Sequence, residues 1–282
     1  MTPRIDTSTH VHSDFVGQDY ILRPIFNRPL VALASSQVGR LKIGRRIQSC
    51  PTALCNLFCL TILFSFACMA APPAQPLTGF PFQDETQRYR INWPTGVGLG
   101  EGRMQAHRIE GGRWQFELSL DASVPGITVT DRYRSVTTPE LCSVEFERES
   151  VHGPRKSHET VTFAQDKSMA HRATTGGGFS DFSVPACAKD ALAFLYFTRW
   201  EMGQGRIPPA GKIIFGGPYD IRLQYTGPQP VKSETTDRLA VTVHGPSSNV
   251  DFELLLARDP ARSPLVIRAP LALGTFSLEL AR

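Results

Sequence analysis

The sequence has few of the patterns that mark an enzyme. It contains no GxSxG elbow, and the Ser247-Ser248 pair lacks the strand-to-helix context of one. It also contains no HExxH motif and no close cysteine pair after residue 71. His152, His158 and His171 could hold zinc only if two loops converged, so solvated loop histidines are favoured. We therefore expect neither a metal nor a cofactor, we assign no catalytic residue, and an enzyme is the least favoured class.

Excess charge is also absent once the N-terminal part is set aside. Residues 1–71 hold seven of the 30 basic and three of the 26 acidic residues, which leaves 23 of each in the remainder. The sequence pI of about 8.8 therefore belongs to the N-terminal part. A formally neutral domain lacks a basic footprint, so nucleic acid is not expected as a partner.

The one long apolar run lies near the N-terminus. Lys42, Arg45 and Arg46 precede the apolar residues 53–71, which end in small side chains. This order of basic, apolar and small residues predicts a secretory signal peptide over 41–71, and hence a periplasmic or envelope protein. Two alternatives stay open: a lipoprotein with lipid on Cys68, and a retained membrane anchor, because the run is near the lower length limit for a span.

The signal divides the chain into segments of different character. Residues 1–40 are polar and poorly periodic, which indicates a disordered extension or a mis-assigned start. Residues 72–84 begin with PPAQP, a sequence typical of a short stiff linker. About 210 residues follow the signal, enough for one domain with a sizeable core. We place that single domain at residues 85–282.

Cysteine is scarce in this domain. Four of the six cysteines lie in or beside the apolar run, and only Cys142 and Cys187 follow it. An even pair in an exported protein favours a disulfide, here between a strand end and the start of a helix. The alternative is two buried free thiols. A bridge would close a loop of about 45 residues, for which chain entropy gives roughly 3–4 kcal/mol.

Only one stretch of the domain, residues 187–203, has a convincing helical pattern. Its helix formers predict a helix over about 188–202. Asp190 is expected in the first turn, where a carboxylate meets the positive end of the helix dipole. Arg199 is expected in the last turn, with Gly203 as the stop.

The helix is apolar around most of its circumference, which is typical of a buried helix. Leu192, Leu195, Tyr196 and Trp200 recur at intervals of three and four residues. We interpret the helix as a structural plug on a curved sheet. The alternative is that Asp190 and Arg199 bind a ligand, although a spacing of nine residues puts them on different faces.

Nearly all the rest of the domain alternates with the period of a β-strand. The predicted strands are 89–93, 104–109, 113–121, 127–134, 141–149, 159–164, 169–174, 212–215, 219–225, 231–235, 239–244, 250–258, 264–270 and 275–281. So many strands predict a mainly β fold: a strongly bent antiparallel meander sheet or open β-barrel. The central helix should cover its concave side.

Two polar features of these strands have simple interpretations. Gly96, Gly98, Gly100 and Gly102 resemble a phosphate loop only superficially, because a strand and not a helix follows them. Placed on one strand face, they would suit sharp curvature or the close approach of another element. The charged residues at 132, 134, 145 and 147 most simply form solvated faces or cross-strand pairs.

Four stretches of sequence, in this order, resemble the bacterial exported family DUF3108, a domain of unknown function. They are YRINWPTGVGLGEG, VPACAKDALAFLYFTR, IIFGGPYDIRLQYTG and FELLLARDPARSPLVIRAPLALGTFSLEL, and the resemblance covers roughly residues 85–282. It implies a secreted, β-rich fold with a barrel-like bent sheet. It implies no activity and no catalytic residue, and the Cys142/Cys187 pair looks like a feature of one branch of the family.

Two functions from different classes follow from these expectations. The favoured function is a non-catalytic binding module whose concave apolar face holds a lipid-like or other apolar envelope ligand. The second is a structural or interaction protein of the envelope, with a protein partner and a core filled by the helix. An apolar cavity that persists beside the packed helix would favour the first, and a filled concavity the second.

Overall fold

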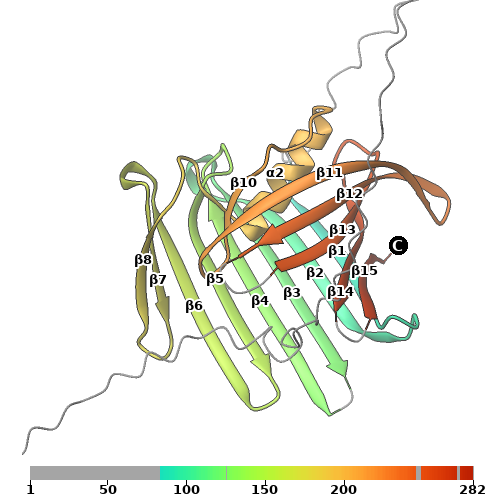
Figure 1. Cartoon of the computed structure of the whole chain (residues 1–282), viewed down its shortest axis with the longest axis horizontal. Helices are drawn as coiled ribbons and strands as arrows, with labels where there is room; N and C mark the ends of the chain where they lie inside the picture. The colour runs from blue at the N-terminus through green and yellow to red at the C-terminus, as the bar shows by residue number, and fades with distance from the viewer. Residues whose placement is uncertain (1–82, 125, 246–248, 272–273, 282) are drawn as a thin grey trace, which may run out of the picture. The chain divides into compact units, whose positions relative to one another are not determined.

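The computed structural model describes residues 83–281, apart from 125, 246–248 and 272–273. In this part of the chain one fifteen-stranded sheet curves around a single α-helix (Figure 1). The prediction of a mainly β fold with one central helix is therefore confirmed. The expected extension, signal peptide and nearly all of the linker lie outside the described residues, as does the Ser247-Ser248 pair.

The described elements are as follows. The strands are β1 Glu85–Asn92, β2 Gly98–Arg108, β3 Trp114–Val124, β4 Ile127–Thr137, β5 Ser143–His152, β6 Arg155–Ala164, β7 Met169–Thr174, β8 Phe179–Ser183, β9 Lys189–Asp190, β10 Gly211–Ile214, β11 Pro218–Val231, β12 Glu234–His244, β13 Asn249–Ala257, β14 Pro264–Leu271 and β15 Gly274–Leu280. The helix is α2, Ala191–Gly203, and the 3-10 turns are η1 Glu110–Gly112 and η2 Gln165–Lys167.

The strand order is a meander with one rearrangement. Strands β1 to β8 run in sequence order on one side, and β9 to β15 on the other. The two runs join where β1 pairs with β15, with Tyr89 opposite Leu280. Every described pair is antiparallel except β9–β10. A parallel pair needs a crossover connection, and α2 supplies it between β9 and β10, so one parallel pair interrupts the predicted antiparallel meander.

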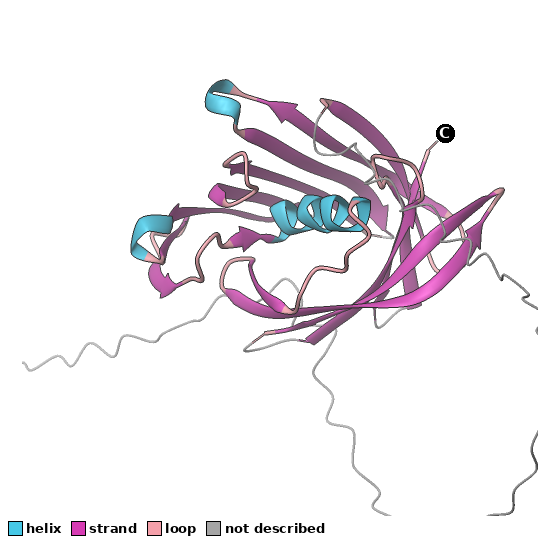
Figure 2. Ribbon diagram, turned by 90° about the horizontal axis from the view of Figure 1, so that it is seen from above, coloured by secondary structure: helices cyan, strands magenta, loops and turns pink. Residues whose placement is uncertain are grey.

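Period-two alternation sends one face of the sheet toward α2. Trp114 and Phe116 point inward from β3 and pack with Met104 of β2 against Leu192 and Tyr196 of the helix. The opposite side of the helix meets a second wall, built from β10 to β13. Figure 2 shows α2 lying between these two stretches of sheet. A helix with apolar walls on both sides needs apolar residues around its circumference.

One predicted strand is wrong. Residues 231–235 were expected to form a strand of their own, but β11 runs to Val231, a turn follows with Lys232 at φ 53°, and β12 begins at Glu234. Pro228 and Pro230 make the end of β11 look like a loop in the sequence. They occupy alternate positions, so both missing N–H groups fall on the strand edge away from β12, where β10 does not reach.

The helix starts three residues later than predicted. Lys189 and Asp190 are extended and form β9, so helical geometry begins at Ala191. Asp190 is therefore the N-cap and not a first-turn residue: its Oδ1 accepts hydrogen bonds from the N–H groups of Leu192 and Ala193, both at 2.9 Å.

The stop at the other end also differs from the prediction. Gly203 is still helical, and Gly205 takes the left-handed conformation with φ 73°. The N–H of Gly205 donates to the carbonyl of Met202, and the N–H of Arg206 to the carbonyl of Glu201. These two bonds form a Schellman motif, for which glycine is the favoured residue.

The glycine-rich stretch at 96–102 contains both a turn and a strand. Gly96 lies in a turn with φ 85°, whereas Gly98, Gly100 and Gly102 lie in β2, so the four do not share one strand face. A Cβ at Gly100 would come within 1.9 Å of the Asp121 carbonyl oxygen on β3. The expected close approach of another element is thus present at Gly100.

Candidate functional site

Asp190 lies in a fully buried polar junction between the helix and the sheet. Its Oδ2 accepts hydrogen bonds from the hydroxyls of Ser135 and Ser143, both at 2.6 Å, while Oδ1 caps the helix. Burial raises the pKa of the Asp190 carboxyl above its usual range, and the four hydrogen bonds oppose this rise. All of its acceptor contacts are internal, which indicates a structural anchor.

Arg199 is also buried. It was predicted in the last turn of the helix, but it lies before that turn. Its guanidinium pairs with both carboxylate oxygens of Glu85 on β1, at 2.5 and 2.9 Å, and donates to the Ala261 carbonyl. It also lies over the Tyr196 ring, 4.9 Å from the centroid. Asp190 and Arg199 thus contact different parts of the sheet, and the alternative that they act together on a ligand finds no geometric support.

The predicted apolar residues of the helix are buried to different degrees. Leu192 and Tyr196 are buried, and the Tyr196 ring stacks on Phe116 with 3.9 Å between centroids. Leu195 and Trp200 are only half-buried, so the helix is not buried around its whole circumference. Trp200 contacts Phe197 and lies 5.9 Å from the Arg206 guanidinium near the surface.

The structure contains the predicted disulfide between Cys142 and Cys187. It joins the segment before β5 to the segment before β9 and α2. Hydrogen bonds reinforce the same junction. The Ser143 N–H donates to the Ala188 carbonyl at 2.9 Å, and the Gln165 side-chain amide donates to the carbonyls of Ser143 and Ala188. The N-terminal end of the helix is thus fixed covalently and by hydrogen bonds.

Each of the three histidines considered for zinc has its own carboxylate. His152 pairs with Asp131, His158 with Glu147 and His171 with Asp181, at 2.7 to 2.9 Å. Within the described residues no group of three or more His, Cys, Asp or Glu is arranged to hold a metal ion.

A charged cluster lies on the inner face of β5, β6 and β7. Glu159 is 2% exposed, and its Oε2 accepts bonds from Arg172 at 2.6 and 2.8 Å and from Arg148 at 3.4 Å. The other oxygen of Glu159 and the Nε of Arg148 are buried with no hydrogen-bond partner in the described part of the chain. Two cations therefore share one buried carboxylate.

The loop between β10 and β11 covers this cluster. The Arg148 guanidinium lies 4.9 Å from the ring centroid of Phe215. Gly216 has φ 70°, and a Cβ there would be 2.9 Å from the Glu159 Oε1. The loop can approach the carboxylate this closely because residue 216 is glycine.

This cluster is absent from the sequence-based candidates, although a signal for it exists. Arg148 and Glu159 are two residues from Phe146 and Val161, so period two puts all four on the same inward face. The alternation of apolar and charged residues at inward positions is visible in the sequence. Their convergence depends on strand register, which the sequence does not specify.

The outer face carries the predicted cross-strand ion pairs. Arg134 of β4 pairs with Glu145 and Glu147 of β5, and Arg132 pairs with Asp121 of β3. A hollow of about 540 Å³ opens over this face, and its lining is more polar than apolar.

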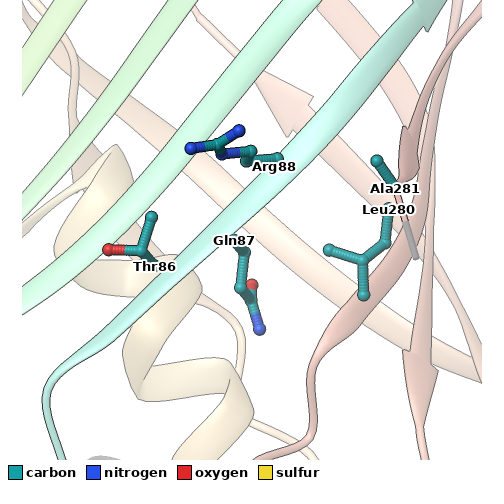
Figure 3. A pocket seen from close by; sticks show the side chains of 5 residues that line it. All are labelled: Thr86, Gln87, Arg88, Leu280 and Ala281. Atoms are coloured by element: carbon teal, nitrogen blue, oxygen red, sulfur yellow. The ribbon is translucent and has the colours of Figure 1, made fainter.

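A second hollow, of about 440 Å³, lies where β15 ends beside β1 (Figure 3). Thr86, Gln87 and Arg88 reach it from β1, and Leu280 and Ala281 from the end of β15. Neither hollow is an enclosed apolar chamber. Among the described helices, none is long and apolar enough to span a membrane.

These features define the chain as a β-barrel-like protein with an internal helix. Residues 88–281 match the profile of a family described as "Protein of unknown function (DUF3108)", and the chain belongs to this family. No curated protein matches the sequence. A solved structure, the beta-barrel-like protein of domain of unknown function DUF1849 from Brucella abortus, is similar with a TM-score of 0.50 and 5% identity, covering 71% of this chain and 96% of that one. At this identity the likeness concerns the fold alone.

Proposed function

We propose that this protein is an exported, non-catalytic interaction or structural protein of the cell envelope. The observation that carries the proposal is the packing of α2 between two apolar walls of the sheet. Phe194 and Met202 of α2 pack into one wall, and Leu192 and Tyr196 pack into the other. The two hollows described above lie over the outer face and at a strand end, away from these contacts.

The unpaired edge of β8 supports a function in protein–protein contact. Strand β8 is the end of the strand order, so one of its edges is unpaired within the described sheet. Phe179 on this strand is 83% exposed. A free edge with an exposed aromatic side chain is suited to contact with another protein.

The runner-up function is a carrier of an apolar or lipid-like ligand. It draws support from half-buried apolar residues around the core, including Leu118, Phe252 and Ile267. The envelope location rests on the basic-then-apolar segment at 41–71. Both functions share this location, so export has to be tested separately from ligand binding.

Native mass spectrometry of protein purified from the bacterial envelope separates the two functions. We expect a mass equal to that of the polypeptide. A stoichiometric bound lipid would contradict the proposal and favour the carrier. The matched control is Phe194→Ala, which leaves a cavity beside α2: lipid in this variant alone would show that side-chain packing excludes it.

Export is tested by expressing the full chain in a bacterium and sequencing the mature N-terminus. Cleavage near residue 71 is expected, because small residues end the apolar run. A cytosolic protein that keeps residues 41–71 would refute export.

A further inference from the structure

The two sulfurs of the disulfide have different electrostatic surroundings. The Lys189 ammonium lies 3.2 Å from the Sγ of Cys187 and 3.1 Å from its carbonyl oxygen. The described hydrogen bonds of Cys142 are backbone bonds: its N–H donates to the Thr138 hydroxyl, and its carbonyl accepts from the Thr138 N–H. Within the described residues no basic side chain contacts its sulfur. The positive charge of Lys189 therefore lies beside the Cys187 sulfur of the disulfide.

The position of Lys189 is fixed by its neighbours. Its ammonium lies 4.6 Å from the Phe197 ring centroid. Burial lowers the pKa of the Lys189 ammonium, and the Glu201 carboxylate opposes this shift. Glu201 is itself bound through both oxygens by Arg206 at 2.8 Å, so this carboxylate has a cationic partner other than Lys189.

The bridge is also accessible and its backbone is unusual. Cys142, Cys187 and Lys189 are half-buried rather than buried. Cys187 has φ 52°, and Leu141, the neighbour of Cys142, has φ 62°. Non-glycine residues in this left-handed region cost free energy and tend to occur at functional sites.

We propose that Cys142–Cys187 is a thiol–disulfide exchange site for a dithiol partner, in which Cys187 is the sulfur released as a thiolate beside Lys189. A thiolate of the dithiol attacks Cys142 Sγ. The Cys142–Cys187 bond breaks, a mixed disulfide forms at Cys142, and the electron pair leaves on Cys187 Sγ. The second thiol of the partner, losing its proton to solvent, then displaces Cys142. The protein disulfide gains two electrons and the dithiol is oxidised to a disulfide.

The asymmetry selects the direction of attack. Exchange is faster when the leaving thiol has a low pKa, and a cation beside a sulfur lowers that pKa. Attack on Cys142 therefore expels the better leaving group. The hydrogen bonds at the junction, from Ser143 to Ala188 and from Gln165 to both, hold the two thiols close together after reduction, so the reaction is reversible without unfolding.

The test uses the full chain reduced with dithiothreitol and pulsed with iodoacetamide at a series of pH values. Mass spectrometry of the peptides that contain residues 142 and 187 reports each thiol separately from the N-terminal cysteines. We expect the Cys187 curve to have its midpoint about one pH unit or more below that of Cys142. Lys189→Met should move the Cys187 midpoint upward, while Lys189→Arg should retain it.

Lys212→Met is the matched control, since Lys212 pairs with Asp220 on the surface and its loss should leave both curves unchanged. Oxidised Lys189→Met should also be reduced by dithiothreitol several-fold more slowly than the native chain. Equal midpoints for the two thiols, or no shift in Lys189→Met, would overturn the proposal. Loss of the native circular dichroism spectrum on reduction would overturn it as well, because the exchange site requires a folded reduced form.

Discussion

The charge of the Asp190 carboxylate stabilises the helix N-terminus, but its burial costs desolvation free energy. The carboxylate caps α2 and accepts two serine hydroxyls, yet it is fully buried. A raised pKa means that the folded protein keeps the proton at pH values where the unfolded chain has lost it. Asp190 ionisation therefore reduces stability as the pH rises from the unfolded value, near 3.8, through the raised folded value.

Asp190→Asn should lose this pH dependence, because the amide stays neutral. We expect it to cost about 1 kcal/mol or less near neutral pH and more near pH 4, relative to the native chain. Asp190→Ala should cost about 3 kcal/mol, because it removes the cap and leaves buried serines without an acceptor. Urea unfolding across this pH range measures both. A penalty for Asp190→Asn that grows toward neutral pH would contradict the raised pKa.

Glu159 is the second residue with a large expected effect. Glu159→Gln leaves two arginines around a neutral amide, and we expect a cost of about 3 kcal/mol in the free energy of unfolding. Glu117→Gln, on the outer face and half-exposed, is the control and should change stability by less than about 0.5 kcal/mol. Similar costs for the two variants would show that the buried cluster is not electrostatically coupled.

At the scale of single elements, two aromatic side chains of the helix differ in how deeply they are buried. Tyr196 is fully buried and stacked on Phe116, whereas Trp200 is half-buried. Tyr196→Ala should therefore cost roughly 3–5 kcal/mol. Trp200→Ala should cost about 1–2 kcal/mol, below the value for a fully buried tryptophan. Thermal or chemical unfolding gives the ranking, and a larger loss for Trp200→Ala would reverse this account of the helix.

The sequence predicts the elements better than their junctions. Period two locates nearly every long strand, and β7 matches its predicted bounds. The short strands β8 and β9 are missed: β8 is mostly exposed and its residues do not alternate, and β9 has only two residues. The helix start is misplaced because Lys189 and Asp190 are adequate helix formers, and only the extended pairing with β10 keeps them out of the helix.

The candidate residues divide in the same way. The presence of just two cysteines after the apolar run predicts the disulfide. The spacing of apolar residues at three and four predicts the apolar face of the helix. Arg199 pairs with Glu85, which is 114 residues away in the sequence. Glu159 pairs with Arg172 on the neighbouring strand. Both pairs depend on strand register. Charged residues at inward positions could have indicated a buried cluster, but their pairing required the folded sheet.

For the whole molecule, the disulfide should stabilise the native state without being required to form it. Reduction removes a constraint on a loop of about 45 residues, for which roughly 3–4 kcal/mol is expected. Unfolding of oxidised and reduced protein in urea measures the difference. A difference near zero would show that the hydrogen bonds around Ser143 and Ala188 already fix the junction.

The pairing of β1 with β15 has a consequence for how the chain is made. The strands of one half of the sheet are complete long before those of the other, and in the described strand pairing the two halves meet only at β1 and β15. A growing chain therefore exposes the edge of β1 until nearly all of the described residues have been synthesised. Contacts so distant in sequence form slowly. Closure of the sheet between β1 and β15 therefore waits for nearly the complete polypeptide.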